Sequence, residues 1–175
     1  MLLSIAVVAS VSYRAHNEAV RSLFRQNYAQ QLLVAKQIAQ GLEKDIHLLI
    51  RELEILSRLP QITALEKTKA ENSIRLTYDY VKQFHVVDIA ILDAGGIVRV
   101  PLIAKKLEGV DFSFRKYFSV ALKLHTLTPT YEFLTFKGVD QGQKGFVLAL
   151  PIFTPSGDFS GVVLFIIKIY AGAVI

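Results

Sequence analysis

The pattern of apolar and polar residues is most regular between Arg14 and Leu59, a stretch with no proline and a single glycine, Gly41. Apolar residues recur there at alternating spacings of four and three, the 3.5-residue period of a helix that packs an apolar stripe on another helix. The pattern predicts a long signalling or dimerisation helix over residues 14–59. This heptad stripe consists of Tyr28, Leu32, Ala35, Ala39, Leu42, Ile46, Leu49, Leu53 and Leu56.

Two partners are open to the heptad stripe: the chain's own domain and a second copy of the chain. About 40 helical residues extend about 60 Å, which is more than the width of a small domain. At least part of the stripe is therefore expected to contact a partner chain, and a homodimer is the preferred interpretation.

The chain is apolar at both ends, and its total apolar fraction of 52% exceeds the roughly 45–50% of soluble domains. Residues 1–13 are too few for a membrane span of about 20 residues. We interpret them as the end of a transmembrane helix, with a buried helix of a soluble protein as the alternative. Arg14, Arg21 and Arg25 follow this run, and the positive-inside rule argues against placing them outside the cytoplasm.

After Pro60, which ends the long helix or begins the next, the pattern changes to short helices and strands. Hairpin turns are indicated at residues 93–96 and 155–158, where glycines supply positive-φ positions. The pattern predicts an α+β domain with one central antiparallel sheet of about five strands flanked by helices. We expect helices at residues 62–66 and 70–84, and strands at residues 86–93, 97–101, 130–136, 146–153 and 161–170.

The segment Gly109–Phe118 combines four aromatic residues with one acid and two bases. Its two oxygen-bearing side chains suit the start of a short helix, after which apolar residues follow at one-face spacing. Arg115 lies next to that face, and its fork of donors suits a carboxylate or phosphate. Either the helix packs on a sheet with Arg115 paired to a protein acid, or it forms a pocket wall with Arg115 as an anion clamp and Tyr117 as a hydroxyl donor. The cap residues are Asp111 and Ser113, and the face is Phe114, Tyr117, Phe118 and Ala121.

The pattern Gly-x-Asp-x-Ser-x-Arg-x-Tyr-Phe in this segment resembles the signature of Cache domains, the PAS-like extracytoplasmic sensor modules of bacterial and archaeal receptors. Blocks at residues 87–98, 145–152 and 157–163 occur in the order and spacing of that family, so the resemblance covers roughly residues 57–170. It implies a Cache domain over residues 60–170, outside the cytoplasm of a membrane protein. Residues 171–175 would then begin a membrane-proximal segment.

The resemblance implies a ligand pocket, because the family uses the matching arginine to bind ligands and the position of Tyr117 is often in the pocket. Tyr131 and Thr135 share one face of a predicted strand and are further candidates. Lys168 is a cation at the end of an apolar strand, either in the pocket or snorkelling at a membrane surface. The pocket candidates are Arg115, Tyr117, Tyr131, Thr135 and Lys168.

Within the family, an amino-acid ligand is not favoured, because Tyr117-Phe118 replaces a Trp-Tyr pair and residues 162–169 contain no acid. The Phe112–Phe118 run and Lys168 are more similar to the dicarboxylate-sensing kinases. A small organic acid is the expected ligand.

Other chemistry finds little support in the residues. The net charge of +5 is spread along the chain, so nucleic acid is not an expected partner. The absence of cysteine excludes disulfides and thiolate chemistry, and the four histidines have no metal-ligand spacing. No serine has recognisable histidine and acid partners, and no phosphate-binding loop is present. We therefore predict no cofactor, no metal and no enzymatic activity for this fragment.

The sequence thus predicts an extracytoplasmic ligand-sensing domain of a membrane receptor, such as a histidine kinase, a chemoreceptor or a cyclic-dinucleotide enzyme. The alternative is a ligand-free structural or dimerisation module, whose pocket is filled by its own side chains. A soluble enzyme is the third interpretation, and no motif suggests its activity.

Overall fold

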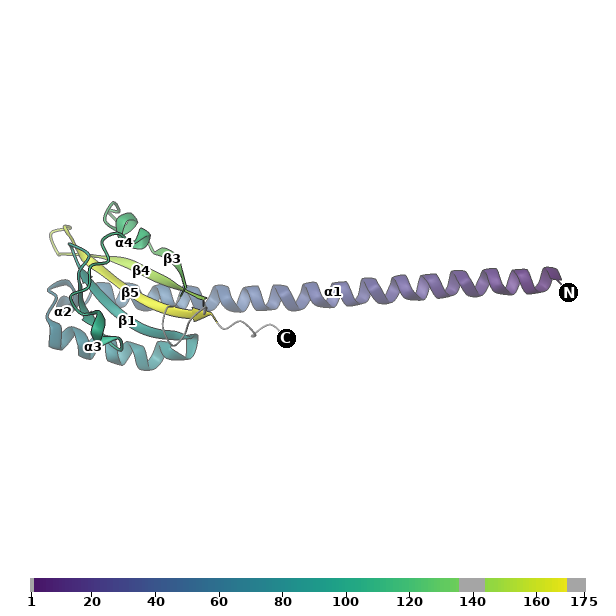
Figure 1. Ribbon diagram of the computed structural model, residues 1–175, viewed down its shortest axis with the longest axis horizontal. Coiled ribbons are helices and arrows are strands. Elements are labelled where there is room, and N and C mark those ends of the chain that lie inside the picture. The colour runs from purple at the N-terminus through teal and green to yellow at the C-terminus, as the bar shows by residue number, and fades with distance from the viewer. Residues whose placement is uncertain (1, 136–143, 170–175) are drawn as a thin grey trace. The chain divides into compact units, whose positions relative to one another are not determined.

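The computed structural model describes residues 2–135 and 144–169, with side chains described for residue 21 and from residue 23 onward. Contacts divide the chain into two units, Met1–Asp45 and Ile46–Ile175. The helices are α1 (Leu2–Ser57), α2 (Pro60–Thr63), α3 (Lys67–Val81) and α4 (Lys116–Ala121), with short 3-10 turns η1 (Lys82–Phe84) and η2 (Lys105–Leu107) (Figure 1). The strands are β1 (Val86–Asp93), β2 (Val98–Pro101), β3 (Thr130–Thr135), β4 (Lys144–Phe153) and β5 (Phe159–Ile169).

One five-stranded sheet in the order β2-β1-β5-β4-β3 forms the centre of the second unit, and every neighbouring pair of strands is antiparallel. β5 lies between β1 and β4, with Leu164 opposite Ala90 on one side and Ala149 on the other. The predicted α+β architecture with a central antiparallel sheet is confirmed. Residue 136, the expected end of the third strand, and residue 170, the expected end of the fifth, lie outside the described residues.

The first core lies between one sheet face and the segment formed by the end of α1, α2 and α3. Leu53 and Leu56 from α1 are 0% and 1% exposed and cluster with Ile74 of α3, Ile89 of β1 and Phe165 of β5. Each of these side chains removes apolar surface from water on the same side of the sheet. This packing fixes the end of α1 to the rest of the second unit.

The heptad stripe is therefore divided between a buried part and an exposed part. Leu49, Leu53 and Leu56 are buried in the chain's own core, whereas Tyr28 and Leu32 are 71% and 60% exposed. The 3.5-residue period is the same for both parts, because packing on a sheet and packing on a helix both need one apolar face.

In the described part of the chain, no helix contains an apolar stretch long enough to cross a membrane.

The second core lies on the opposite face of the sheet, beneath α4. Figure 1 shows α4 and α3 on opposite sides of the sheet. Tyr117 and Phe118 are each 3% exposed and Ala121 is 0% exposed, and they pack with Val147 of β4 and Leu164 of β5. We call this the α4 face of the sheet.

Candidate functional site

Backbone contacts position the signature segment before α4. Gly96, in the β1–β2 turn, has a φ of 84°, and a Cβ placed there would lie 2.7 Å from the Cα of Ser113. The amide of Phe112 donates to the Gly96 carbonyl at 2.9 Å, and Ile97 forms an isolated β-bridge with Asp111. Only glycine accommodates this approach without displacing the neighbouring backbone. The turn thus holds the residues that lead into α4.

The helix of the signature segment begins later than the sequence suggested. α4 starts at Lys116 with Arg115 as its N-cap, and Phe114 is 71% exposed rather than on the buried helical face. The physical reason is local: the carboxylate of Asp111 accepts the amide proton of Ser113 at 2.7 Å, and this forms a turn instead of capping the helix. That hydrogen bond lowers the pKa of Asp111.

Arg115 lies at the edge of the α4 face with an acid beside it. Its Nη1 lies 3.6 Å from Oε1 of Glu132 on β3, and the two side chains are 35% and 20% exposed. The guanidinium carbon also lies 5.7 Å and 5.2 Å from the ring centroids of Phe112 and Phe114, within cation–π distance. The sequence left two interpretations of Arg115, a pair with a protein acid and an anion clamp. For the first, the structure identifies Glu132 as the acid.

Glu132 joins α4 to β3 through a second contact, because its Oε2 accepts the backbone N–H of Tyr117 at 3.3 Å. The Tyr117 carbonyl in turn accepts the hydroxyl proton of Thr130 at 3.2 Å. Sequence reasoning missed Glu132, although the alternation of β3 places it on the same face as Thr130 and Leu134. Glu132 therefore links β3 to Arg115 and to the first turn of α4.

Tyr117 is buried in the second core, as the sequence suggested for a residue of the helical face. Burial raises the pKa of its phenol far above the ordinary value, and the nearby carboxylate of Glu132 adds to this while Arg115 opposes it. The hydroxyl is therefore neutral over the whole physiological range. It can act as a hydrogen-bond donor but not as a charged partner.

The structure does not bring Tyr131 and Thr135 together with Arg115. Successive side chains of a strand point to opposite faces, and Glu132 faces α4, so Tyr131 and Thr135 lie on the other face of β3. Tyr131 is 66% exposed, and its ring lies 6.3 Å from that of Phe133. The five candidates thus divide between the two sheet faces.

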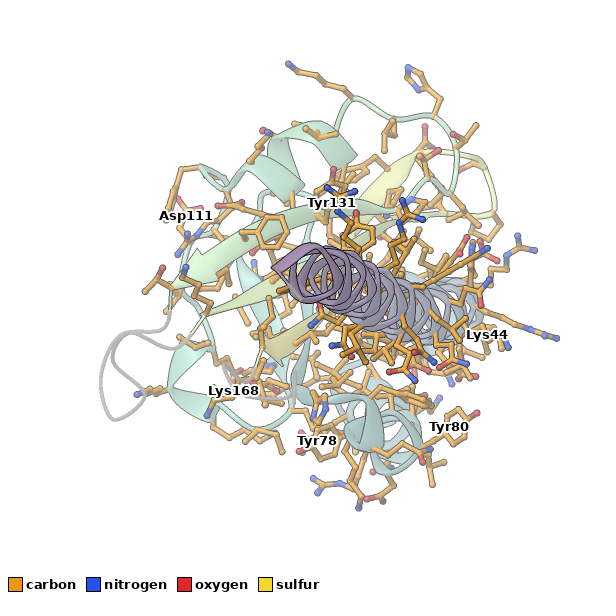
Figure 2. The ribbon with its side chains drawn as sticks, turned by 90° about the vertical axis from the view of Figure 1, so that its right-hand side faces the viewer. Lys44, Tyr78, Tyr80, Asp111, Tyr131 and Lys168 are labelled. Atoms are coloured by element: carbon orange, nitrogen blue, oxygen red, sulfur yellow. The ribbon has the colours of Figure 1, made fainter. Side chains whose placement is uncertain are left out.

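Lys168 occupies the α4 face, two strands away from β3. It alternates with Ile167 of the first core and pairs with Gly145 on β4, which pairs with Leu134 on β3. Glu132 lies two residues before Leu134 on β3. The distance between β5 and β3, across two strand spacings, is about 10 Å. Tyr131 and Lys168 appear well apart in Figure 2. Arg115 and Lys168 therefore contribute two cations to one face.

The described residues contain no group of three or more His, Asp and Glu side chains arranged for a metal ion. The site chemistry that they do offer is a guanidinium, a carboxylate and an ammonium group on one sheet face. This set suits an ionic ligand.

Comparison with known proteins gives likeness in structure but not in sequence. No family model matches the chain, and no curated protein matches it. The solved structures that it resembles include an extracellular ligand-binding receptor from Desulfohalobium retbaense, with a TM-score of 0.60, 19% identity, and coverage of 75% of this chain and 24% of that one.

Two further solved structures resemble it. The sensor domain of the histidine kinase DctB from Vibrio cholerae has a TM-score of 0.59 and 16% identity, over 87% of this chain and 58% of that one. A domain of a putative sensory box/GGDEF family protein from Vibrio parahaemolyticus has a TM-score of 0.54 and 15% identity, over 74% of this chain and 54% of that one.

The second unit has a Cache-type, PAS-like sensor fold. At these identities the likeness concerns the fold alone. The chain spans between about a quarter and three fifths of the length of these three structures. The fold expected from the signature is thereby confirmed.

Proposed function

We propose that the chain is the extracytoplasmic ligand-sensing domain of a membrane signal-transduction receptor, such as a histidine kinase, a chemoreceptor or a cyclic-dinucleotide enzyme. Its ligand is a small organic anion bound on the α4 face. The observation that carries the proposal is the half-buried Arg115 on a sheet whose fold resembles those of an extracellular ligand-binding receptor and a histidine kinase sensor domain. No catalytic step is assigned to this part of the protein.

Membrane attachment is part of the proposal. Residues 1–13 supply the end of a transmembrane helix, and residues 171–175 begin a membrane-proximal segment. Residues 2–13 are helical, and residues 171–175 lie outside the described residues. The support is the apolar composition of both ends together with the signature.

The ligand class follows from the cations of the α4 face. The pair between Arg115 and Glu132 is long, at 3.6 Å, and Glu132 also accepts the Tyr117 N–H. A ligand carboxylate can therefore take the guanidinium while Glu132 keeps its contact with α4. A second acidic group on the ligand would be directed towards Lys168. A small dicarboxylate satisfies both cations.

A ligand that exchanges with Glu132 also gives a physical route to signalling. Glu132 connects β3 to α4 through two contacts, the Tyr117 N–H and the ion pair with the N-cap residue Arg115, so releasing the ion pair removes one of the two and changes the packing of α4 on the sheet. Binding then favours one of two packings by the difference in ligand affinity between them.

The test is a titration with succinate, malate and fumarate. Calorimetry measures the binding, and the rise of the melting temperature provides a second measurement. Arg115→Ala is expected to weaken binding by ten- to a hundred-fold, because a charge-assisted hydrogen bond is worth about 1.5–3 kcal/mol. Arg115→Lys is expected to weaken binding by a similar factor, since an ammonium group cannot form the two-point contact of a guanidinium with a carboxylate. Without ligand, Arg115→Ala should change stability by at most about 1 kcal/mol, because the pair is partly exposed.

Arg75 on α3 provides the matched control, because it also pairs with a glutamate but lies on another element. Arg75→Ala should leave binding unchanged. The proposal for Arg115 fails if Arg115→Ala melts several degrees lower while the affinity for a verified dicarboxylate is that of the wild type.

A ligand-free structural or dimerisation module is the second candidate function. It is favoured by one observation: Arg115 already has Glu132 as its partner, and Tyr117 and Phe118 fill the space beneath α4. In that case no carboxylate raises the melting temperature. Arg115→Ala and Glu132→Gln would then show coupled losses of stability in a double-mutant cycle.

A homodimer through α1 is also proposed, and the first unit is the part of the helix that supports it. Tyr28, Leu32 and Leu42 are 71%, 60% and 56% exposed, and they continue the heptad stripe beyond the part that the domain buries. Exposed apolar stripes of this period pair with a second helix by knobs-into-holes packing.

Leu32→Glu combined with Leu42→Glu is expected to convert the dimer to a monomer while the second unit stays folded. The reason is that both substitutions place like charges opposite each other in the proposed interface. Sedimentation velocity measures the mass. Leu33→Glu, at a neighbouring position that is 57% exposed and outside the stripe, is the control. A wild-type chain that is monomeric well above micromolar concentration would contradict the interface.

A further inference from the structure

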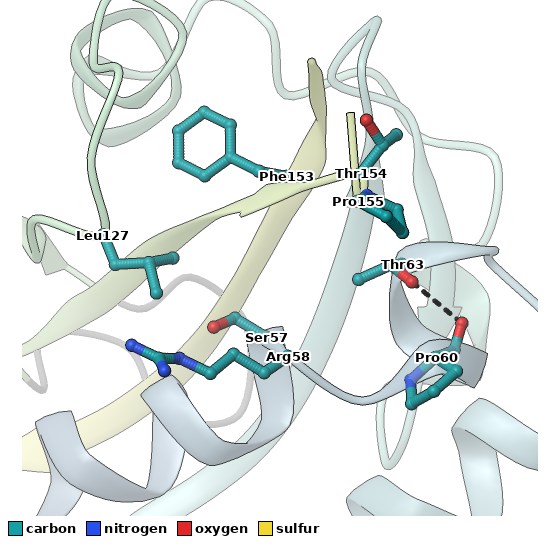
Figure 3. A pocket seen from close by; sticks show the side chains of 8 residues that line it. All are labelled: Ser57, Arg58, Pro60, Thr63, Leu127, Phe153, Thr154 and Pro155. Atoms are coloured by element: carbon teal, nitrogen blue, oxygen red, sulfur yellow. Dashed lines mark hydrogen bonds between the residues drawn. The ribbon is translucent and has the colours of Figure 1, made fainter. Parts of the chain in front are cut away.

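A cavity of about 270 Å³ lies where the end of α1 meets α2 and the β4–β5 turn (Figure 3). All of its walls belong to the second unit, and it shares no residue with the α4 face. The lining residues are Ser57, Arg58, Pro60, Thr63, Leu127, Phe153, Thr154 and Pro155.

Arg58 gives the cavity its positive charge. It follows the last residue of α1, and no carboxylate of the described residues forms an ion pair with it. In Figure 3 its side chain extends beneath Leu127, along one wall of the cavity. A guanidinium has five N–H donors in a planar fork, which matches a carboxylate in two-point contact.

Two other hydroxyl groups of the lining, those of Ser57 and Thr63, have already used their protons. Ser57 Oγ donates to the Glu54 carbonyl and Thr63 Oγ1 donates to the Pro60 carbonyl, each at 2.9 Å. Their oxygen atoms can still accept a hydrogen bond. They therefore offer no donor to an anionic head group, which leaves Arg58 as its partner among these side chains.

The hydroxyl proton of Thr154 is also already used, in a hydrogen bond to Ser156. Ser156 Oγ donates its single proton to Oδ2 of Asp158 at 2.7 Å, so the 2.7 Å contact between Thr154 Oγ1 and Ser156 Oγ must use the proton of Thr154. Arg58 therefore supplies the uncommitted side-chain donors of the cavity.

The remaining walls are apolar. Pro60, Leu127, Phe153 and Pro155 surround the space, which exceeds the roughly 150 Å³ cavity that accommodates benzene. The α2 side is held in place, because Ser160 Oγ on β5 donates to the Thr63 carbonyl at 3.0 Å. A cavity formed in advance by fixed elements is the usual form of a small-molecule site.

We propose that this cavity is a second ligand site, for a small monocarboxylate with an aromatic or branched aliphatic body. Arg58 binds the carboxylate, and the body lies against Leu127 and Phe153. The site is independent of Arg115, and it joins the end of α1 to the β4–β5 turn. A bound acid therefore stabilises the contact between these two elements.

The test uses the 175-residue chain, amide chemical shifts and titration with benzoate up to about 20 mM, a range that detects a Kd near 1 mM. Benzoate should give saturable shifts at Thr63, Leu127 and Thr154. Benzyl alcohol, which has the ring without the charge, should bind at least tenfold more weakly. Arg58→Gln should weaken benzoate binding at least tenfold without lowering the melting temperature, because Arg58 is exposed.

Arg51→Gln is the matched control, since this exposed arginine of α1 does not line the cavity, and it should bind benzoate as the wild type does. Arg115→Ala should also retain benzoate binding at this site. The proposal is overturned if benzoate gives no saturable shifts, or if Arg58→Gln and benzyl alcohol match the wild type and benzoate. Shifts centred on Arg115 that vanish in Arg115→Ala would equally overturn it, and they would instead support the α4-face site.

Discussion

Leu53→Asp is expected to unfold the second unit, whereas Leu32→Glu on the same helix and in the same heptad stripe is expected to leave it folded. Leu53 is 0% exposed in the first core, and Leu32 is 60% exposed. Loss of a buried leucine costs about 2–5 kcal/mol, and an unpaired buried carboxylate adds several more. The sum reaches the whole stability of about 5–15 kcal/mol of a typical domain.

Far-UV circular dichroism and urea unfolding measure this difference. Leu53→Ala should give an intermediate loss of about 2–5 kcal/mol, because it leaves a cavity without burying a charge. Any effect of Leu32→Glu on dimerisation is seen separately by sedimentation. If Leu53→Asp unfolds at the same urea concentration as Leu32→Glu, then the end of α1 does not pack on the sheet.

The heptad stripe shows what apolar periodicity can and cannot predict. The 3.5-residue period identified the helix, since one apolar face in a long stretch free of proline leaves few other structures. It did not identify the partner of that face. Leu53 meets a sheet and Leu32 is exposed, yet both are leucines at equivalent heptad positions. The division depends on where the rest of the chain folds, which the local pattern does not contain.

The strands were predicted more closely than the helix contacts. β1 has the bounds that its β-branched run and glycine turn indicated, because both signals are local. The position of β5 between β1 and β4 is a long-range pairing. Hairpin signals connect only strands that follow each other in sequence, so the local pattern did not predict this strand order.

At the candidate site, Arg115 came from the signature, and its partner Glu132 was missed. Tyr131 and Thr135 were candidates because they share one face of the strand, but it is the opposite face, that of Glu132, which is turned towards α4. Residue chemistry alone does not show which face of an edge strand is covered, because β3 exposes its aromatic residues. The signal that was present was the period-two set of Thr130, Glu132 and Leu134.

Arg58 could not be identified as a site residue from the sequence, for a different reason. No motif surrounds it, and its place at the cavity depends on the β4–β5 turn nearly a hundred residues later in the chain. A free guanidinium is recognised only by comparing it with every nearby carboxylate. That comparison requires coordinates.

Gly161→Ala is expected to be the most damaging single-methyl change in the sheet. A Cβ at Gly161 would lie 2.0 Å from the carbonyl oxygen of Leu92 and 3.1 Å from its carbonyl carbon. Gly161 pairs with Asp93 on β1 and Ile152 on β4, so the clash is with backbone in the middle of the sheet. Overpacking costs about 1–3 kcal/mol, and each ladder hydrogen bond lost adds about 0.5–1.5 kcal/mol.

Gly157→Ala, in the β4–β5 turn, separates steric clash from backbone conformation. Gly157 has a φ of 92°, and nothing lies within 4 Å of a Cβ placed there, so its substitution costs only the left-handed conformation, about 1–2 kcal/mol. The free energies of unfolding of the two variants, measured by heat and urea, should therefore differ by about 1–2 kcal/mol, with Gly161→Ala the less stable. Equal losses would mean that β5 moves away from Leu92 at little cost, and that the close approach of the two strands is not what requires glycine.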